Sequence, residues 1–488
     1  MRSRSPACTC SLFATAGGVP VCRTAFSYDA KGLLVGETNP RGGTSQIVRD
    51  AKGFPVSVTT ADGVTTESEY DALGHLVAAS RGGVELFRNT VDPDGRVTRT
   101  DYPDGTYETV TYDAMRRPVE VTDRSGRITT LAYSIGSTVT NTTVSYIGID
   151  GMEHAHSESV RHDTQLNTRE VRNAGRVAVE AYVLDAQDRV VAVTNAEGQV
   201  ARMEYELGSR VSRMQRFDGT EVGYSWDAFG MKEAAYPSFT NTYERLMDGS
   251  LLSATGPNGT VGYAYDKFGN VTEAATEQGN VSYAHDNAGY VTRRSFGAGH
   301  VDYAYDTAGR LTGMMWNVGG VSMPFNYEYS PVNGALAAVE YPNGVVSERG
   351  YDVMDRLSLI GWSGYDSADA DTRQYSYDNA DNIVSIATAD GATIDYAYDG
   401  IDRLAGESKS DASGASLRSA AYIYDDCGNR ICNSLSVDGV TEECANSFEA
   451  GDRLAGWKSI LESIALMPWL ASTAWNPLAR STREITLK

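Results

Sequence analysis

The sequence repeats an aromatic–aspartate pair at a nearly constant spacing. Tyr28-Asp29, Tyr70-Asp71 and Tyr112-Asp113 stand 42 residues apart, with Asp50 and Asp92 halfway between them, so that an aspartate recurs every 21 residues. Such a short unit cannot bury a core alone, and stacked units are therefore expected to form one extended structure instead of separate globules. Later copies of the pair are Tyr265-Asp266, Tyr305-Asp306, Tyr351-Asp352, Tyr377-Asp378, Tyr398-Asp399 and Tyr424-Asp425.

Each copy has the residues of a tight turn. In the copy that begins with Tyr305 and Asp306, Gly309, Arg310 and Leu311 follow. An aspartate at this place accepts hydrogen bonds from backbone N–H groups further along, and glycine tolerates the positive φ that closes the turn. Between these copies stand dipeptides that predict two-residue hairpins: Asp62-Gly63, Asp104-Gly105, Asp218-Gly219, Asn258-Gly259, Asn343-Gly344 and Asp390-Gly391.

Two short strands and two turns per unit predict an all-β strip of antiparallel hairpins over residues 26–456. Twenty-nine tyrosines, many of them two positions apart, favour strands with an aromatic face. Residues 1–25 are expected to be a poorly ordered leader, with a signal peptide left open. An insert at about 145–160 interrupts the register, and residues 457–488 are expected to form a tail with a short helix.

Charge and cysteine content exclude several classes of partner. Forty-two basic and 64 acidic residues give a net charge of −22, and the basic residues do not cluster. Nucleic acids and anionic membranes are therefore not expected partners, and no stretch predicts a membrane span. The six cysteines lie near the two ends without zinc-ligand spacing, and their disulfide state stays open.

The repeated motif resembles the YD repeat of the Rhs family, which includes wall-associated bacterial proteins and, more distantly, the teneurins. The resemblance covers about residues 26–456. It implies a β-strip that spirals into a hollow shell or an open half-shell, which in bacterial members encloses a C-terminal toxin delivered to competing cells. The Asp-Pro-x-Gly-Leu ending at which such cores are cut is missing, because the chain's one Asp-Pro is Asp92-Pro93. Autoproteolysis and toxicity are therefore not expected of this chain.

Candidate chemical sites are few. Phosphate-loop, zinc-protease and nucleophile-elbow motifs are absent, so neither catalysis nor a cofactor is predicted. His154, His156 and His162 form a weak metal candidate, against which an exposed polar loop is preferred. Turn capping is preferred to calcium binding for the repeated aspartates, and packing is preferred to sugar stacking for the tyrosines, which are expected to be mostly buried.

Two functions follow from these observations. The first is a non-enzymatic shell that encloses a toxin or effector polypeptide for competition between bacteria. The second is an extracellular adhesion or carbohydrate-binding protein built on the same repeats. Both place the chain outside the cell or at its surface, where secretion machinery or surface glycans are the further expected partners.

Overall fold

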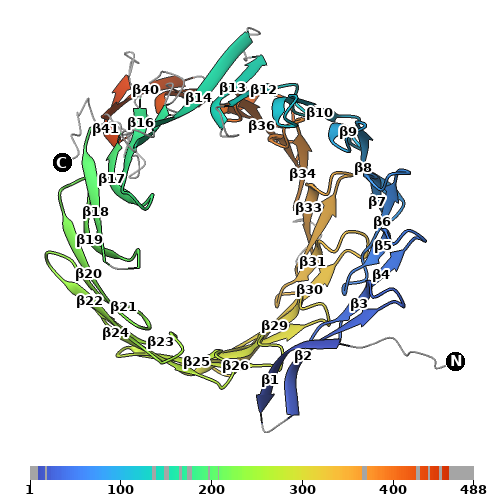
Figure 1. The fold of residues 1–488 in the computed structure, drawn as a ribbon. Helices are drawn as coiled ribbons and strands as arrows, with labels where there is room; N and C mark the ends of the chain where they lie inside the picture. The colour runs from blue at the N-terminus through green and yellow to red at the C-terminus, as the bar shows by residue number, and fades with distance from the viewer. Residues whose placement is uncertain are drawn as a thin grey trace, which may run out of the picture. The chain divides into compact units, whose positions relative to one another are not determined.

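The computed structural model describes a single kind of element, the antiparallel β-strand (Figure 1). Among the described residues, the paired strands follow each other along the chain, which is the meander that the repeat predicts. The described residues are 9–16, 19–133, 139–147, 153–163, 168–172, 178–195, 198–206, 208–364, 371–424, 429–437, 440–449 and 453–460.

The strands that precede residue 222 are β1 (Thr9–Ala16), β2 (Val19–Tyr28), β3 (Leu34–Thr38), β4 (Thr44–Arg49), β5 (Pro55–Thr59), β6 (Thr65–Tyr70), β7 (Leu76–Arg81), β8 (Val84–Val91), β9 (Val97–Asp101), β10 (Tyr107–Tyr112), β11 (Pro118–Thr122), β12 (Ile128–Tyr133), β13 (Val139–Ile147), β14 (Glu153–Asp163), β15 (Thr168–Arg172), β16 (Ala178–Leu184), β17 (Val190–Asn195), β18 (Val200–Tyr205), β19 (Val211–Gln215) and β20 (Glu221–Asp227). The later strands are β21 (Gly230–Ala235), β22 (Thr240–Arg245), β23 (Leu251–Gly256), β24 (Gly259–Tyr265), β25 (Val271–Thr276), β26 (Gly279–His285), β27 (Val291–Phe296), β28 (Gly299–Tyr305), β29 (Leu311–Val318), β30 (Val321–Tyr329), β31 (Leu336–Glu340), β32 (Val346–Tyr351), β33 (Leu357–Ser363), β34 (Asp371–Tyr377), β35 (Ile383–Thr388), β36 (Thr393–Tyr398), β37 (Leu404–Ser410), β38 (Ser416–Tyr424), β39 (Arg430–Val437), β40 (Val440–Glu449) and β41 (Arg453–Ile460).

The turns are longer than the Asp-Gly dipeptides predict. In the turn that contains Asp62 and Gly63, the N–H of Thr60 donates to the carbonyl of Val64 at 2.9 Å, which leaves three residues in the loop. The prediction of two-residue loops is therefore wrong for this dipeptide. Gly63 takes a positive φ of 85°, and a type I turn followed by such a residue forms a three-residue loop with a bulge. The turn after Asp266 has the same backbone hydrogen bonds.

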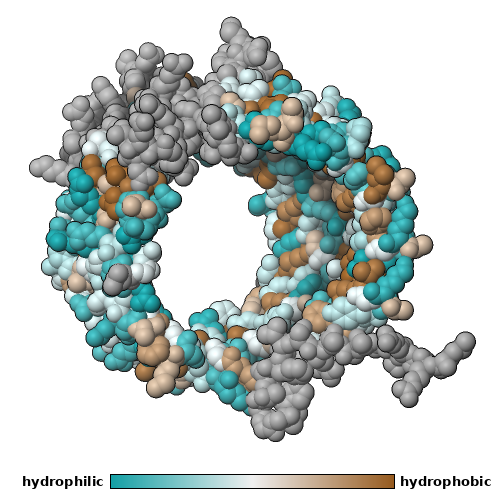
Figure 2. Space-filling model, in the orientation of Figure 1, coloured by the Kyte–Doolittle hydropathy of each residue, from teal (hydrophilic) through white to brown (hydrophobic). Residues whose placement is uncertain are grey.

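The buried core is thin and consists of small side chains. Val222 is fully buried and Ala78 and Ala201 nearly so, whereas the tyrosines of the motif are only half-buried. On the face shown in Figure 2, apolar residues are interspersed among hydrophilic ones. A single sheet layer accounts for this thin core, because no second layer covers either face. Only the small side chains that lie beneath the aromatic rings of adjacent residues are shielded from solvent.

The strip extends beyond its expected limits. Strand β1 and most of β2 lie within the expected leader, and β41 continues to Ile460, so that Trp457 and Ile460 belong to a strand instead of the expected helix. Residues 461–488 lie outside the described residues. The insert at about 145–160 is a long hairpin of β13 and β14, in which Ile147 pairs with Glu153, and it stays within the sheet.

The chain divides into two compact units, each built from two distant segments. Unit 1 contains residues 1–107 and 222–372, and unit 2 contains residues 108–221 and 373–488. Among the described residues of each unit, the two segments meet through their turns and do not pair strands with each other. The turn edges of the strip are therefore the candidate location of a functional site.

Candidate functional site

The motif pair occupies the same structural position in each described copy. The tyrosine ends a strand and the aspartate begins the turn, where its backbone N–H bonds the carbonyl four residues on. Asp425 lies outside the described residues. The pairs placed in this way are Tyr28-Asp29, Tyr70-Asp71, Tyr112-Asp113, Tyr265-Asp266, Tyr305-Asp306, Tyr351-Asp352, Tyr377-Asp378 and Tyr398-Asp399.

The turn itself uses both carboxylate oxygens of the aspartate. Oδ1 of Asp71 accepts the backbone N–H groups of Leu73, Gly74 and His75 at 2.7–2.9 Å, and Oδ2 lies 2.8 Å from Nδ1 of His75. The backbone N–H of His75 and then its imidazole lower the pKa of Asp71 from 3.8 to about 2. The backbone N–H of Arg96, followed by its guanidinium, likewise lowers the pKa of Asp92. These contacts favour the capping role over calcium binding.

The tyrosine hydroxyl connects successive hairpins, a role that the sequence analysis did not foresee. Tyr265 donates a hydrogen bond of 2.7 Å to the carbonyl of Leu251, the residue that opens the strand after the preceding turn. This bond fixes the ring on the strip although the side chain is only half-buried. The same bond joins Tyr70 to Pro55, Tyr133 to Pro118, Tyr205 to Val190, Tyr305 to Val291, Tyr329 to Leu311, Tyr351 to Leu336, Tyr398 to Ile383 and Tyr424 to Leu404.

An arginine after the turn covers the ring of the next copy. Arg310 Nε donates to Asp306 Oδ2 at 2.8 Å, and the guanidinium carbon lies 4.5 Å from the ring centroid of Tyr329. The cation occupies one face of the ring, which favours packing over sugar stacking for these tyrosines. The same arrangement joins Arg117 to Tyr133, Arg189 to Tyr205 and Arg403 to Tyr424.

Alternate turns of a meander lie on opposite edges of the strip, and the two edges carry different residues. We call the turns that follow the motif tyrosine the Asp-turn edge, and the turns between them, such as 39–42, 60–63 and 123–126, the opposite edge. Among the described residues, the Asp-turn edge comprises turns 29–32, 50–53, 71–74, 92–95, 113–116, 185–188, 227–230, 246–249, 266–269, 286–289, 306–309, 330–334, 352–355, 378–381 and 399–402.

In unit 1 the opposite edge of the first segment contacts the Asp-turn edge of the second. Arg41 forms an ion pair with Asp286, and its Nε donates to the backbone carbonyl of Asp306 at 2.8 Å. A Cβ added to Gly43 would lie 2.3 Å from the carbonyl oxygen of Thr307, so that only glycine permits this approach. We call these contacts between the two edges the seam.

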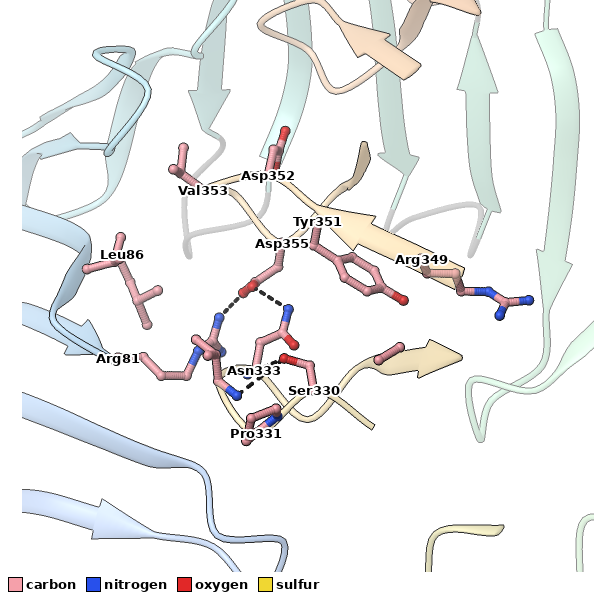
Figure 3. Close-up of a pocket in the computed structure, with 13 residues that line it drawn as sticks. Arg81, Leu86, Ser330, Pro331, Asn333, Arg349, Tyr351, Asp352, Val353 and Asp355 are labelled. Carbon is pink, nitrogen blue, oxygen red and sulfur yellow. Dashed lines mark hydrogen bonds and ion pairs between the residues drawn. The ribbon is translucent and has the colours of Figure 1, made fainter. Parts of the chain in front are cut away.

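The unit 1 seam continues at Asp355, beside a pocket (Figure 3). Arg81 pairs with this carboxylate, which also accepts a hydrogen bond of 3.0 Å from Asn333 Nδ2. The pocket has a volume of about 460 Å³. Its walls combine apolar side chains from both segments with polar and charged residues, and it is lined by Arg81, Val84, Leu86, Ser330, Pro331, Val332, Asn333, Ala337, Arg349, Tyr351, Asp352, Val353 and Asp355.

Unit 2 has a seam of the same kind. Nη1 of Arg124 lies 2.8 and 2.9 Å from the two carboxylate oxygens of Asp381. Arg127 pairs with Asp402, which also accepts a hydrogen bond of 2.8 Å from Asn382 Nδ2. Charged hydrogen bonds with two acceptor oxygens are among the stronger and more directional polar contacts in proteins.

Three seam aspartates stand where the turn otherwise has glycine. Asp355, Asp381 and Asp402 have φ values of 61°, 66° and 65°, in the left-handed region that costs energy for a residue with a Cβ. The carboxylate of each pairs with an arginine from the facing edge, and this contact offsets the energetic cost of the positive φ. The sequence signal was visible as aspartate in the glycine position, but its partners, more than 250 residues away, were not.

The remaining candidates from the sequence stay untested. His154, His156 and His162 lie in strand β14, but their side chains are outside the described part of the chain. Among the described residues, no three His, Cys, Asp or Glu side chains gather in a way that would hold a metal ion. Nor do the described residues include a helix long and apolar enough to cross a membrane.

Comparison with known proteins identifies the repeat. The family model "RHS Repeat" matches residues 49–84, 91–133 and 248–281. The fold is similar to a crystal structure of TcdB2-TccC3 without its hypervariable C-terminal region, with a TM-score of 0.71, 12% sequence identity and coverage of 89% of this chain and 26% of that one. A second TcdB2-TccC3 crystal structure matches with a TM-score of 0.59, 11% identity and coverage of 88% and 33%. No curated protein matches in sequence. This chain thus spans about a quarter to a third of the structures that it resembles.

Proposed function

We propose that this RHS-repeat chain is a segment of shell wall that encloses a toxin-like polypeptide and performs no chemistry of its own. The seam carries the proposal. Within each unit, the turn edges of two distant segments contact each other through arginine–aspartate pairs. A strip that is wound into a wall needs such contacts between its neighbouring windings if the wall is to exclude macromolecules. The likeness of fold to the TcdB2-TccC3 structures supports the same interpretation.

The use of the motif residues supports a wall rather than an enzyme. The Asp71 carboxylate contacts backbone N–H groups and the His75 imidazole, the Tyr265 hydroxyl bonds a backbone carbonyl, and the Arg310 guanidinium bonds Asp306. Groups that are engaged in this way hold the strip together and are not poised for proton transfer or nucleophilic attack. We therefore expect no hydrolytic or toxic activity from the chain alone.

The charge of the chain favours a basic guest. A net charge of −22 produces a field that attracts cationic polypeptides and repels acidic ones. The toxin nature of the guest, its use in competition between bacteria, and a location outside the cell or at its surface all come from the family resemblance, and belong to the proposal.

Protection of a guest from protease tests this proposal. The chain is expressed together with a toxin domain encoded at the same locus, and the complex is exposed to a nonspecific protease. We expect the guest to survive at least tenfold longer than the free domain. Equal digestion of the guest with and without the chain would refute enclosure, and turnover of a nuclease, protease or glycosidase substrate by the chain alone, lost on a single substitution, would refute the non-enzymatic role.

A matched pair of variants links protection to the seam. Arg81→Gln removes a seam arginine, whereas Arg213→Gln removes an exposed arginine that pairs with Glu221 away from the seam. Protection is expected to fall in the first variant and to persist in the second. Equal protection in both variants would show that the seam does not retain the guest.

A further inference from the structure

The hairpin formed by β29 and β30 (Figure 1) ends in an uncharged tip with exposed apolar side chains. Residues 311–327 contain no charged side chain, in a chain in which 22% of residues are charged. Within this run the exposed fraction is 37% for Met315, 41% for Trp316, 40% for Val318 and 59% for Val321. Such a cluster is unusual on a surface that only water contacts, and it indicates a site of interaction with a protein or a membrane.

The turn of this hairpin matches a turn in the seam but lacks its arginine. Gly319-Gly320 has φ values of 59° and 82°, and Gly82-Gly83, at the tip of the β7–β8 hairpin, has φ values of 58° and 81°. Arg81 directly precedes the second pair and forms an ion pair across the seam, whereas Val318 precedes the first pair. The β29–β30 tip therefore lacks the cation that a seam contact uses.

The tip has few polar groups that need water or a further strand. The Ser322 hydroxyl donates to Asn317 Oδ1 at 2.6 Å. Beyond the pair of Asn326 and Glu340, β30 has β29 on one side and no paired strand on the other among the described residues. Pro324 stands in this free edge and has no N–H to donate, which disfavours the addition of a strand and lowers the cost of leaving water.

The tip is apolar on both of its faces. Directly paired residues of neighbouring strands project from the same face. Val318 and Val321 are paired, and Trp316 shares their face because it lies two positions before Val318. Met315 is paired with Pro324 on the other face, where both are exposed. A protein that covers one face of the hairpin leaves the other in water, whereas lipid surrounds the tip and covers both.

The nearest ion pair limits how deeply the tip can enter an apolar phase. Asp302 lies opposite Met315 in the neighbouring strand β28 and pairs with Arg293. His300 also lies on β28, with Nε2 at 3.4 Å from Asp302. Residues 316–318 separate the level of the Asp302–Arg293 pair from the turn, which is about 10 Å at the strand rise of ~3.3 Å per residue. This length agrees with the depth of about 5–10 Å at which interfacial segments bury their apolar side chains.

We propose that the hairpin tip, residues 315–323, inserts into the headgroup region of an uncharged lipid surface. The net charge of −22 repels anionic lipids, and the tip offers no cation to attract them, so that a zwitterionic surface is the one that fits. Trp316 is of the residue type that prefers the boundary between headgroups and acyl chains. The inference goes beyond the enclosure of a guest and does not depend on it.

Vesicle flotation tests the contact. The full chain is mixed with phosphatidylcholine vesicles at millimolar lipid, and the fraction that floats with them is measured. We expect Val321→Glu to lower this fraction about tenfold, because it places a charge in the inserted tip. Val48→Glu is the matched control, since Val48 is a 57% exposed valine in strand β4. This control should float as the parent does, and vesicles that contain phosphatidylserine should bind the parent less well.

A fluorescent label reports which part of the chain enters the lipid. In a chain whose six native cysteines are replaced by serine, an environment-sensitive fluorophore is attached at Ser322→Cys or at Gln278→Cys. Gln278 lies in the loop between β25 and β26, on the same edge of the strip as the tip. Addition of phosphatidylcholine vesicles should shift the emission of the label at position 322 to the blue and leave the label at position 278 unchanged.

The remaining outcomes contradict the proposal. A parent chain that does not float, or equal flotation of Val321→Glu and Val48→Glu, would show that the tip does not bind lipid. A blue shift at position 322 on raising the protein concentration without vesicles would make a second copy the occupant. If Val321→Glu loses the circular dichroism of the parent, Val318→Ser repeats the comparison. No guest is present, so a negative result here leaves the enclosure experiment unaffected.

Discussion

Removal of one tyrosine hydroxyl should loosen the strip locally. Tyr265→Phe deletes the 2.7 Å hydrogen bond to the carbonyl of Leu251 and leaves the ring in place. A hydrogen bond of this kind contributes about 1 kcal/mol. Tyr265→Ala also removes the half-buried ring, which adds about half of the ~3–5 kcal/mol of a fully buried one, for a total of roughly 2.5–3.5 kcal/mol.

Native-state hydrogen exchange measures this effect, because each repeat contacts mainly its neighbours and opens with them. A loss of about 1 kcal/mol raises the exchange rate of amides in β23 to β25 about fivefold in Tyr265→Phe, with little change in the distant β35. Tyr263→Phe is the control, since this tyrosine lies two residues away on the same face and its hydroxyl has no partner among the described residues. Equal exchange in the Tyr265→Phe and Tyr263→Phe variants would refute the role of the hydroxyl.

Three further predictions concern the aspartates. Asp306→Ala should cost about 0.5–2 kcal/mol by loss of its turn contacts, measured as a lower thermal midpoint. His75 lowers the pKa of Asp71 from 3.8 to about 2, so the charged form of Asp71 stabilises the fold above pH 4. This contribution should disappear as the pH falls toward 2, and Asp71→Asn should flatten that part of the profile of stability against pH. Asp355→Gly should lower the thermal midpoint through loss of its partners, whereas Asp188→Gly, which loses none, should change stability by less than about 1 kcal/mol; equal effects would contradict the role of the seam.

The local structure was predictable because its determinants are local. The spacing of the Tyr-Asp pairs fixes the strands, and the aspartate and glycine of each copy fix the turn, all within about six residues. The two-residue hairpin was wrongly predicted at Asp62-Gly63 for a related reason, whereas the loop at Asn258 has two residues, since Gly256 pairs with Gly259. Asp62-Gly63 specifies a positive φ at the glycine, but the same dipeptide also suits a three-residue loop, which the backbone bond from Thr60 to Val64 selects.

The candidate site was only partly predictable, because its partners are distant in the chain. Arg41 and Asp286 are separated by 245 positions, and no local pattern pairs them. Half of the signal was in the sequence, since Asp355 and Asp402 replace the expected glycine. The other half, arginines at or beside the turns of the opposite edge such as Arg41, Arg81 and Arg124, becomes meaningful only once the two edges are known to face each other.

Cross-linking across the unit 1 seam tests the account most directly. In a chain whose six native cysteines are replaced by serine, cysteines are placed at Arg81 and Asp355, or at Arg81 and Asp248 as the control, which lies in a turn of the same edge outside the seam. A short bis-maleimide is added, and the linked peptides are identified by mass spectrometry. The account predicts an efficient intramolecular link between positions 81 and 355 and none between 81 and 248. Absence of the first link, or equal formation of both, would contradict it.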